Sequence, residues 1–146
     1  MGVNSCTISA EEVIRTLETE KTLTLATCAG SRVTIRPMSH INDGLTVFFQ
    51  TGSDSLKIRQ IKENPYVALC VGTYQIEGVA IGIGHPLAVE NEFFATAYKE
   101  KHPGSYERYS ALEDEIVVKV TIHRVKQWRY VNGKPLLVEN NFTEGE

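Results

Sequence analysis

Apolar residues that recur at every second position are the feature of this sequence that most constrains its fold. The pattern is present in TLTLATC (22–28), in RVTIRPM (32–38) and in IVVKVTI (116–122). It is typical of β-strands, because successive side chains of a strand point to opposite faces. Segments with strand character follow one another over 22–51 and 66–90 and do not alternate one for one with helices. This order favours an antiparallel barrel with peripheral helices over a parallel α/β sheet.

The sequence between these runs predicts the remaining elements. Ser9 and Glu12 have the spacing of a capping box, so a helix is expected to begin there. The triplet NDG at 42–44 indicates a hairpin turn. We expect about six or seven strands, and helices over 9–20, 54–63, 91–101 and 104–112. The length of 146 residues indicates a single domain over 1–146, with a polar tail from about residue 139.

Composition excludes several functional classes. With 42% hydrophobic and 23% charged residues, the chain resembles ordinary globular proteins. A net charge of −3 gives no electrostatic reason to expect nucleic acid as a partner. No apolar run has the length of a membrane helix, and the first residues lack the pattern of a signal peptide. We therefore expect no membrane partner, although MGVNSC fits the loose pattern for myristoylation at Gly2 and palmitoylation at Cys6.

The potential metal ligands are scattered. Three cysteines without a CxxC pair suggest neither a disulfide framework nor a zinc site. Cys28 and Cys70 lie in apolar runs, where we expect buried thiols, and a reducing cytoplasm is the simplest location. The histidines, which show no metal-ligand spacing, are His40, His85, His102 and His123. With no GxSxG or similar nucleophile motif either, the sequence predicts no metal site and names no catalytic residue.

The stretch FFQTGSDSLKIRQI (48–61) predicts a strand end, a short polar loop and a helix start. Lys57 falls in the first turn of that helix, where the helix dipole already places partial positive charge. A cation at this position is explained if an anion binds there, because free backbone amides also point out of a helix start. The alternatives are a solvated lysine and two serines, Ser53 and Ser55, that act only as helix caps.

The NDG hairpin brings a second cation towards this loop. If Asp43 and Gly44 form a two-residue turn, the facing pairs are Met38–Phe49, Pro37–Gln50 and Arg36–Thr51. Arg36 and Lys57 would then share one small volume with the hydroxyls of the loop, which suits a phosphate. A longer turn would shift the register and turn Arg36 elsewhere. Arg36 could also pair with Asp54 or Glu63.

Two other segments carry weaker signals. In QIEGVAIGIGH (75–85), the face with Ala80, Gly82 and Gly84 is nearly bare and would let a flat ligand or another backbone approach closely. This face gives a motive for a dimer. The acidic run at 113–115 is expected to be a solvated turn.

The run RVTIRPMSHINDGLTVFFQTGSDSLKIRQIKENPYVALCV resembles the flavin-binding split-barrel proteins related to pyridoxamine 5′-phosphate oxidase. The shared pattern is an Arg-Pro-Met-like strand, a hairpin, a Phe/Tyr-x-Thr strand end, Ser-x-Lys at a helix start and Asn-Pro-x-Val before the next strand. The similarity is firm over about 32–90 and looser through the later helices and the tryptophan strand. It implies a mainly β fold, a six-stranded antiparallel split barrel, and a homodimer with FMN in clefts between the subunits.

The resemblance also implies which residues bind the cofactor. By position in the family pattern they are Arg36, Pro37, Met38, Ser39, Gln50, Thr51, Ser55, Lys57 and Trp128. Arg36, Met38 and Ser39 would line the flavin ring and the ribityl chain, with the phosphate as the alternative partner of Arg36. Gln50 and Thr51 would contact the flavin or the ribityl chain. The phosphate would bind Ser55 and Lys57, and Trp128 would approach from the other subunit.

The function implied is an FMN-dependent oxidoreductase that acts on an unidentified small substrate, with NAD(P)H as a candidate electron donor. Genuine pyridoxamine 5′-phosphate oxidase activity is not expected, because no segment rich in arginine and tryptophan follows Trp128. The alternatives are a non-catalytic flavin store or stress-response protein, and a haem- or deazaflavin-binding relative. For haem, His40 and His85 are the first residues to inspect.

Overall fold

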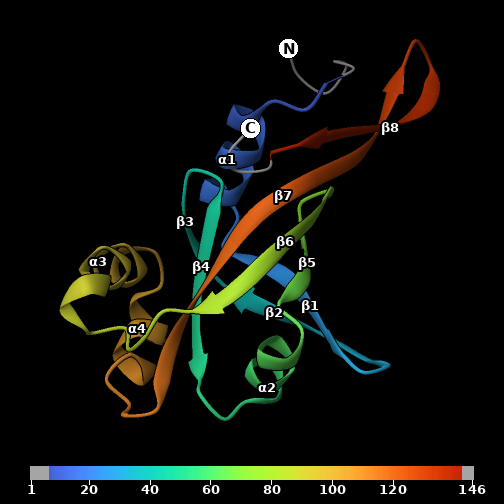
Figure 1. Ribbon diagram of the computed structural model, residues 1–146. Coiled ribbons are helices and arrows are strands. Elements are labelled where there is room, and N and C mark those ends of the chain that lie inside the picture. Colours follow the sequence, from blue (N-terminus) through green and yellow to red (C-terminus); the bar gives the residue numbers. More distant parts are fainter. Residues whose placement is uncertain (1–6, 143–146) are drawn as a thin grey trace.

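The computed structural model describes residues 7–142, so Gly2 and Cys6 lie outside the described residues. The elements are α1 (Ala10–Thr19), β1 (Thr22–Ala29), β2 (Arg32–Ser39), β3 (Ile41–Asp43), β4 (Thr46–Gly52), α2 (Leu56–Glu63), β5 (Tyr66–Val71), β6 (Tyr74–Gly82), the 3-10 turn η1 (Val89–Asn91), α3 (Glu92–Lys101), α4 (Pro103–Tyr109), β7 (Glu115–Val131) and β8 (Lys134–Asn141). All strands belong to one antiparallel sheet with the order β2-β1-β5-β6-β7-β4-β3, and β8 pairs with β7 (Figure 1).

The sheet is an open barrel, and its opening lies between β2 and β4. Along the chain β2 leads through His40 directly into β3, but β2 pairs with β1 whereas β3 pairs with β4. No ladder joins β2 to β4 among residues 7–142, so the strands separate at this point. The mainly β, antiparallel split barrel is thus confirmed, with eight strands in place of the six expected. The short β3 and the late β8 account for the difference.

The interior of the barrel is filled by one face of each long strand. Alternation along β1 places Leu23 and Leu25 inside, and β4 adds Phe49. On β7 the same alternation buries Val118 and Val120. Burial of these aliphatic and aromatic side chains is the main favourable term for the fold.

The longest strand, β7, contains a bulge that changes which residues face inwards. Gly78 of β6 pairs with Ile122, but the preceding residue Glu77 pairs with Arg124, so His123 is the extra residue. Beyond the bulge the buried positions are odd-numbered, and Val125 and Arg129 face inwards. Because a bulge also increases strand twist, the end of β7 leaves the barrel as a long hairpin with β8 (Figure 1).

The helices cover the ends and one side of the barrel. Figure 1 shows α1 and α2 at opposite ends, and α3 and α4 together beside β4. The predicted capping box opens α1, with Ser9 N donating to Glu12 Oε2 at 2.8 Å. Helix α2 begins after the N-cap Ser55 and ends before Pro65, as the sequence predicts. None of the helices in 7–142 is long and apolar enough to span a membrane.

The predicted hairpin register is wrong. Asp43 pairs with Thr46, so Gly44 and Leu45 form the turn, and Gly44 takes the positive φ of 60° that such a turn requires. The pairing stops after Ile41 with Phe48. The predicted pairs Met38–Phe49, Pro37–Gln50 and Arg36–Thr51 therefore do not exist. Strand β2 pairs with β1 along its whole length and forms no ladder with β4.

Only part of the nearly bare face of β6 is covered, since Gly82 and Gly84 are exposed and Ala80 is not. Ala80 is only 3% exposed and belongs to the core, whereas Ile81 on the opposite face is 61% exposed. A Cβ at Gly78 would lie 2.6 Å from the carbonyl oxygen of Thr121, so glycine is needed because β7 approaches closely. The close backbone contact at Gly78 is made within this chain, whereas the approach of a second copy to Gly82 and Gly84 stays a prediction.

Two expectations about burial also change. Cys28 is partly exposed and Cys70 exposed, because both point to the outer face of the sheet. The first residues of the expected polar tail, 139–141, belong to β8, in which Val138 is buried, and residues 143–146 lie outside the described residues. Asn140 Nδ2 donates to the carbonyl of Ile8 at 2.7 Å and fixes this strand to the start of α1.

Candidate anion site at the opening of the barrel

A cavity of about 290 Å³ lies at the opening between β2 and β4. It is lined by Pro37, Met38, Ser39, Gln50, Thr51, Gly52, Tyr98, Ser105, Tyr109 and Glu115. Five of the sequence-predicted residues are therefore brought together, even though the predicted pairing between their strands is absent. The free edges of β2 and of the end of β4 place them there, since β2 pairs only with β1 and the pairing of β4 with β3 stops at Phe48.

Two further polar side chains, Ser55 and Lys57, lie beside Thr51 at one end of the cavity. Lys57 is the second residue of α2, and its Nζ donates to Thr51 Oγ1 at 3.0 Å. Thr51 Oγ1 in turn lies 3.3 Å from Ser55 Oγ, which accepts from the backbone N–H of Ile58 as the helix cap. The first turn of α2 contains no acidic residue. Lys57 thus keeps two N–H donors available beside the free amides of a helix start.

Arg36 lies near this group but does not line the cavity. Its guanidinium donates to Leu25 O at 3.2 Å and to Thr27 Oγ1 at 3.0 Å, and it also donates to Thr34. Neither Arg36 nor Lys57 forms an ion pair with any of the residues 7–142. The predicted alternatives, in which Arg36 pairs with Asp54 or Glu63, are therefore wrong.

The electrostatic surroundings of the two cations are unfavourable on balance. Burial lowers the pKa of Lys57, the repulsion by Arg36 lowers it further, and Glu115 opposes the shift without forming an ion pair. Burial likewise lowers the pKa of Arg36. An anion placed between them would reverse both effects, because a nearby opposite charge favours the charged form of a group.

Two buried polar side chains face the other part of the cavity. Gln50 Oε1 accepts from Ser110 Oγ at 2.8 Å, but Gln50 Nε2 is buried without a partner. Glu115, expected in a solvated turn, is 91% buried, and burial raises the pKa of its carboxyl. A buried N–H without a partner is costly, and cavities that hold such groups are frequently ligand sites.

Sequence reasoning missed the wall that the α3–α4 hairpin provides. The hydroxyl oxygens of Tyr98 on α3 and Ser105 on α4 are hydrogen-bonded at 2.9 Å. Tyr109 at the end of α4 also lines the cavity. No motif or spacing marks these residues, because they reach the cavity only through tertiary packing. Trp128, by contrast, is predicted for the site but lies thirteen residues along β7 from Glu115, roughly 40 Å of strand. It is 59% exposed on the β7–β8 hairpin.

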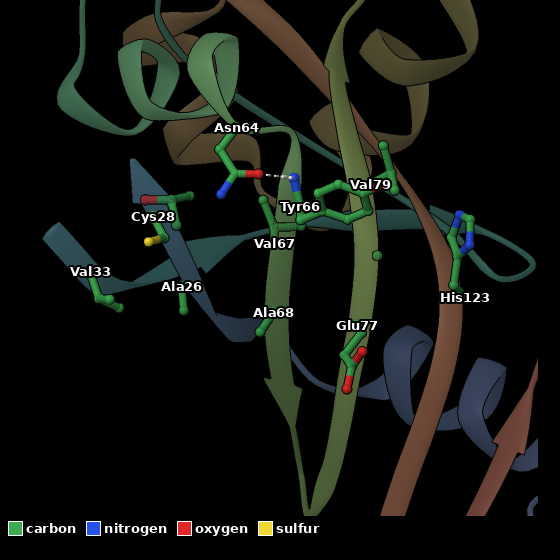
Figure 2. A pocket seen from close by; sticks show the side chains of 12 residues that line it. Ala26, Cys28, Val33, Asn64, Tyr66, Val67, Ala68, Glu77, Val79 and His123 are labelled. Atoms are coloured by element: carbon green, nitrogen blue, oxygen red, sulfur yellow. Dashed lines mark hydrogen bonds between the residues drawn. The ribbon is translucent and has the colours of Figure 1, made fainter. Parts of the chain in front are cut away.

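A larger pocket of about 430 Å³ lies on the outer face of the sheet. Figure 2 shows that its side chains come from neighbouring strands, among them Val33 of β2, Ala26 of β1, Tyr66 of β5 and Val79 of β6. The register explains this gathering, because Ala26 pairs with Ala68 of β5 and Tyr66 pairs with Val79. Exposed apolar side chains surround the pocket.

The histidines expected for haem are engaged in structural contacts. His40 is fully buried with Nε2 at 2.8 Å from Leu17 O. His85 Nε2 lies 2.8 Å from Leu112 O, and its Nδ1 accepts from the backbone N–H of Leu87. Within the described part of the chain, no group of three or more His, Cys, Asp or Glu side chains is arranged to hold a metal ion.

The sequence and the fold were compared with those of known proteins. A family model described as pyridoxamine 5′-phosphate oxidase matches residues 9–129, which is most of the chain. The chain belongs to the pyridoxamine 5′-phosphate oxidase family. The match begins at the cap of α1 and ends in β7, so it includes both edges of the barrel opening. A comparison with curated protein sequences found no match.

Solved structures share the fold of this family member. A FAD-binding protein from Mesorhizobium loti is 14% identical with a TM-score of 0.65, and the match covers 81% of this chain and 92% of that chain. HutZ, the haem storage protein from Vibrio cholerae, is 15% identical with a TM-score of 0.66, covering 77% and 88%. An F420 reductase is 20% identical with a TM-score of 0.61, covering 74% and 90%. At these identities the similarity establishes the fold.

Proposed function

We propose that this member of the pyridoxamine 5′-phosphate oxidase family binds FMN at the barrel opening and uses it as an oxidoreductase on a small substrate. The observation that carries the proposal is the pair Arg36 and Lys57, two partly buried cations with no acidic partner, beside the start of α2. A phosphate monoester fits this pair, because it carries two charges and accepts several hydrogen bonds. The flavin would supply the redox chemistry when bound.

The remaining groups of the site suit the rest of such a ligand. Ser55 and Thr51 offer hydroxyls next to Lys57, where the ribityl phosphate would end. Met38 and the backbone of Ser39 form the wall on which a flat ring could pack. Gln50 Nε2, buried without a partner, is a donor for a carbonyl or ring nitrogen of the flavin. In this proposal the protein binds and orients the cofactor and excludes water around it.

We further propose that the protein is a homodimer formed through the outer face of the sheet. Four large apolar side chains on this face are more than 60% exposed: Val33, Ile35, Tyr66 and Ile81. Single exposed apolar residues are common, but a contiguous group around a pocket is typical of an interface. The exposed Trp128 continues this face onto the β7–β8 hairpin, so a partner subunit could place its own Trp128 near the barrel opening of the first.

A related cofactor is the second candidate. The fold similarity to an F420 reductase and to a haem storage protein supports deazaflavin or haem in place of FMN. Haem at the barrel opening receives little support from His40 or His85, since both rings are engaged by backbone groups. His123 instead lines the larger outer pocket, so it is the histidine to replace if haem binds.

The absorption spectrum of the purified protein, before and after addition of FMN, tests the proposal. Bound flavin gives bands at about 370 and 450 nm, and haem gives an intense band at about 400 nm. A colourless protein that takes up no added FMN would contradict the flavin proposal. To separate an enzyme from a store, bound FMN is reduced with NADH or NADPH, and its reoxidation by a panel of acceptors is timed. No turnover with any acceptor would favour storage or sensing.

A further inference from the structure

Arg36 is linked to helix α2 through three buried or partly buried polar side chains. Thr27 on β1 and Thr34 on β2 both contact its guanidinium, and both threonines also contact Gln60 of α2. Thr27 is 1% exposed and Gln60 is 3% exposed. Gln60 thus lies one hydrogen-bonded step behind the Arg36 guanidinium.

The hydrogen bonds have only one consistent arrangement. Gln60 Nε2 donates to the carbonyl of Arg32 at 3.1 Å, and this contact fixes which atom of the amide faces the threonines. Gln60 Oε1 then accepts from Thr27 Oγ1 at 2.5 Å and from Thr34 Oγ1 at 2.6 Å. Because each hydroxyl has one hydrogen, both threonine oxygens are left as acceptors. They are therefore available to accept from Arg36.

The same count shows which part of Arg36 stays available. A guanidinium has five N–H groups. Both on Nη1 are engaged, by Leu25 O and Thr27 Oγ1, and Thr34 Oγ1 accepts one from Nη2. The two threonine oxygens are 3.1 Å apart, which suits the end of the guanidinium formed by Nη1 and Nη2. The free N–H groups are then Nε–H and one Nη2–H, the edge that binds a carboxylate or phosphate in a bidentate manner.

We propose that Gln60 is a positioning residue that, through the hydroxyls of Thr27 and Thr34, holds Arg36 with this edge turned to an anionic ligand. The proposal rests on the proposed function in one respect, that the anion is the phosphate of FMN. We call the hydrogen-bonded chain from Gln60 through the two threonines to Arg36 the relay. Its neutral groups fix the orientation of the Arg36 guanidinium, which explains how this second cation stays next to Lys57 without an ion-pair partner. Removing the relay frees the guanidinium to rotate away from Lys57.

The first test compares FMN with riboflavin, which lacks the phosphate. Gln60→Leu is expected to raise the Kd of FMN about tenfold and that of riboflavin less than about twofold. The double variant Thr27→Val/Thr34→Val should have the same effect, and combining all three changes should add little, because the residues act as one unit. Lys62→Gln, exposed on the same helix, is the control. An equal loss for both flavins would show that Gln60 has only a structural role.

The second test needs no flavin. In the ligand-free protein, the side-chain N–H signals of Arg36 in NMR spectra should show slow rotation of the guanidinium, and Gln60→Leu should make this rotation fast. Identical Arg36 signals in both proteins would overturn the relay, whatever FMN does. If the parent protein binds no flavin, the proposed function fails while this measurement still decides the relay. Should Gln60→Leu unfold, Thr34→Val replaces it, with Thr34→Ser expected to restore slow rotation.

Discussion

Arg36 and Arg129 are both withdrawn from solvent in the same small barrel, but their surroundings differ in kind. Arg129 is 3% exposed and forms an ion pair with Glu12 of the α1 capping box. It also donates to Gln127 Oε1 at 2.7 Å and to the carbonyl of Thr7 at 3.0 Å. Tyr74 completes this group by donating to Glu12 Oε1 at 2.7 Å. All charge in this region is therefore neutralised within the chain.

Arg36 has no such partner. The charged group that it affects is a second cation, Lys57, whose pKa it lowers. Neutral oxygens hold it, and one edge of its guanidinium stays free. This difference distinguishes buried charges that stabilise the fold from buried charges that are available to a ligand. A buried charge that is paired inside the chain serves the fold, whereas buried charges of like sign that lack a partner indicate a ligand.

The largest effect is expected for the closed region. Arg129→Leu leaves the partly buried Glu12 beside Tyr74 without its cation, so we expect the free energy of unfolding to fall by about 3–5 kcal/mol. Chemical denaturation followed by circular dichroism measures the loss. Glu12→Gln leaves the more deeply buried Arg129 guanidinium without its anion, so it should cost a similar amount. A loss below about 1 kcal/mol for Arg129→Leu would place this pair among ordinary surface ion pairs.

The pH dependence of stability is expected to arise from a third buried group, His40, and not from either arginine. The pKa of His40 is lowered to about 4, mainly by burial and also by the neighbouring Lys101 and His102, whereas a hydrogen bond to Leu17 opposes the shift. His40 is therefore neutral in the folded protein but takes up a proton near pH 6.5 when unfolded. Its contribution is fully present above pH 6.5 and is lost as the pH falls towards 4.

This titration should remove about 3 kcal/mol of stability between pH 6.5 and pH 4. Denaturation curves recorded across this range measure the slope. His40→Gln should flatten most of it, and the remainder is assigned to His102, whose pKa is also lowered by burial. A slope that His40→Gln leaves unchanged would show that another group carries the acid sensitivity. Arg36 and Lys57 stay charged throughout and should contribute none of it.

The smallest effect on stability is expected at the open region. Arg36→Met removes the repulsion that acts on Lys57 but also the hydrogen bonds to Thr27 and Thr34. These opposing contributions should leave the free energy of unfolding within about 1 kcal/mol of the parent protein. The same denaturation assay provides the measurement. If Arg36→Met destabilised the fold as much as Arg129→Leu, the distinction between the two regions would be lost.

Much of the fold follows from local patterns in the sequence. Period-two alternation located the long strands, the Ser9–Glu12 box located α1, and Asn64-Pro65 located the end of α2. The register of the NDG hairpin was wrong because the sequence does not show that β2 leaves β4 for β1. On the bare face of β6, Ala80 lies in the core and not at the surface for a similar reason. Small residues indicate a close approach, but they do not identify the strand that approaches.

Part of the candidate site was predicted from a sequence motif, and part was predicted correctly from a pairing that does not exist. Ser55 and Lys57 were found because a helix start has a recognisable chemistry. Arg36 comes close to Lys57 as expected, but by the opening of the barrel and not by the predicted pairing with Thr51. Tyr98, Glu115 and the orphan amide of Gln50 depend on packing between distant segments, for which the sequence contains no signal.

The central claim is that Lys57 and Arg36 bind the phosphate of FMN, and paired titrations of FMN and riboflavin test it most directly. With Lys57→Ala, the Kd of FMN should rise about 10- to 100-fold, as for loss of a hydrogen bond between charged groups. The Kd of riboflavin should change less than about twofold, because riboflavin has no phosphate to contact this lysine. Lys62→Ala, on the exposed side of the same helix, is the control. Equal weakening of both flavins by Lys57→Ala would contradict the account.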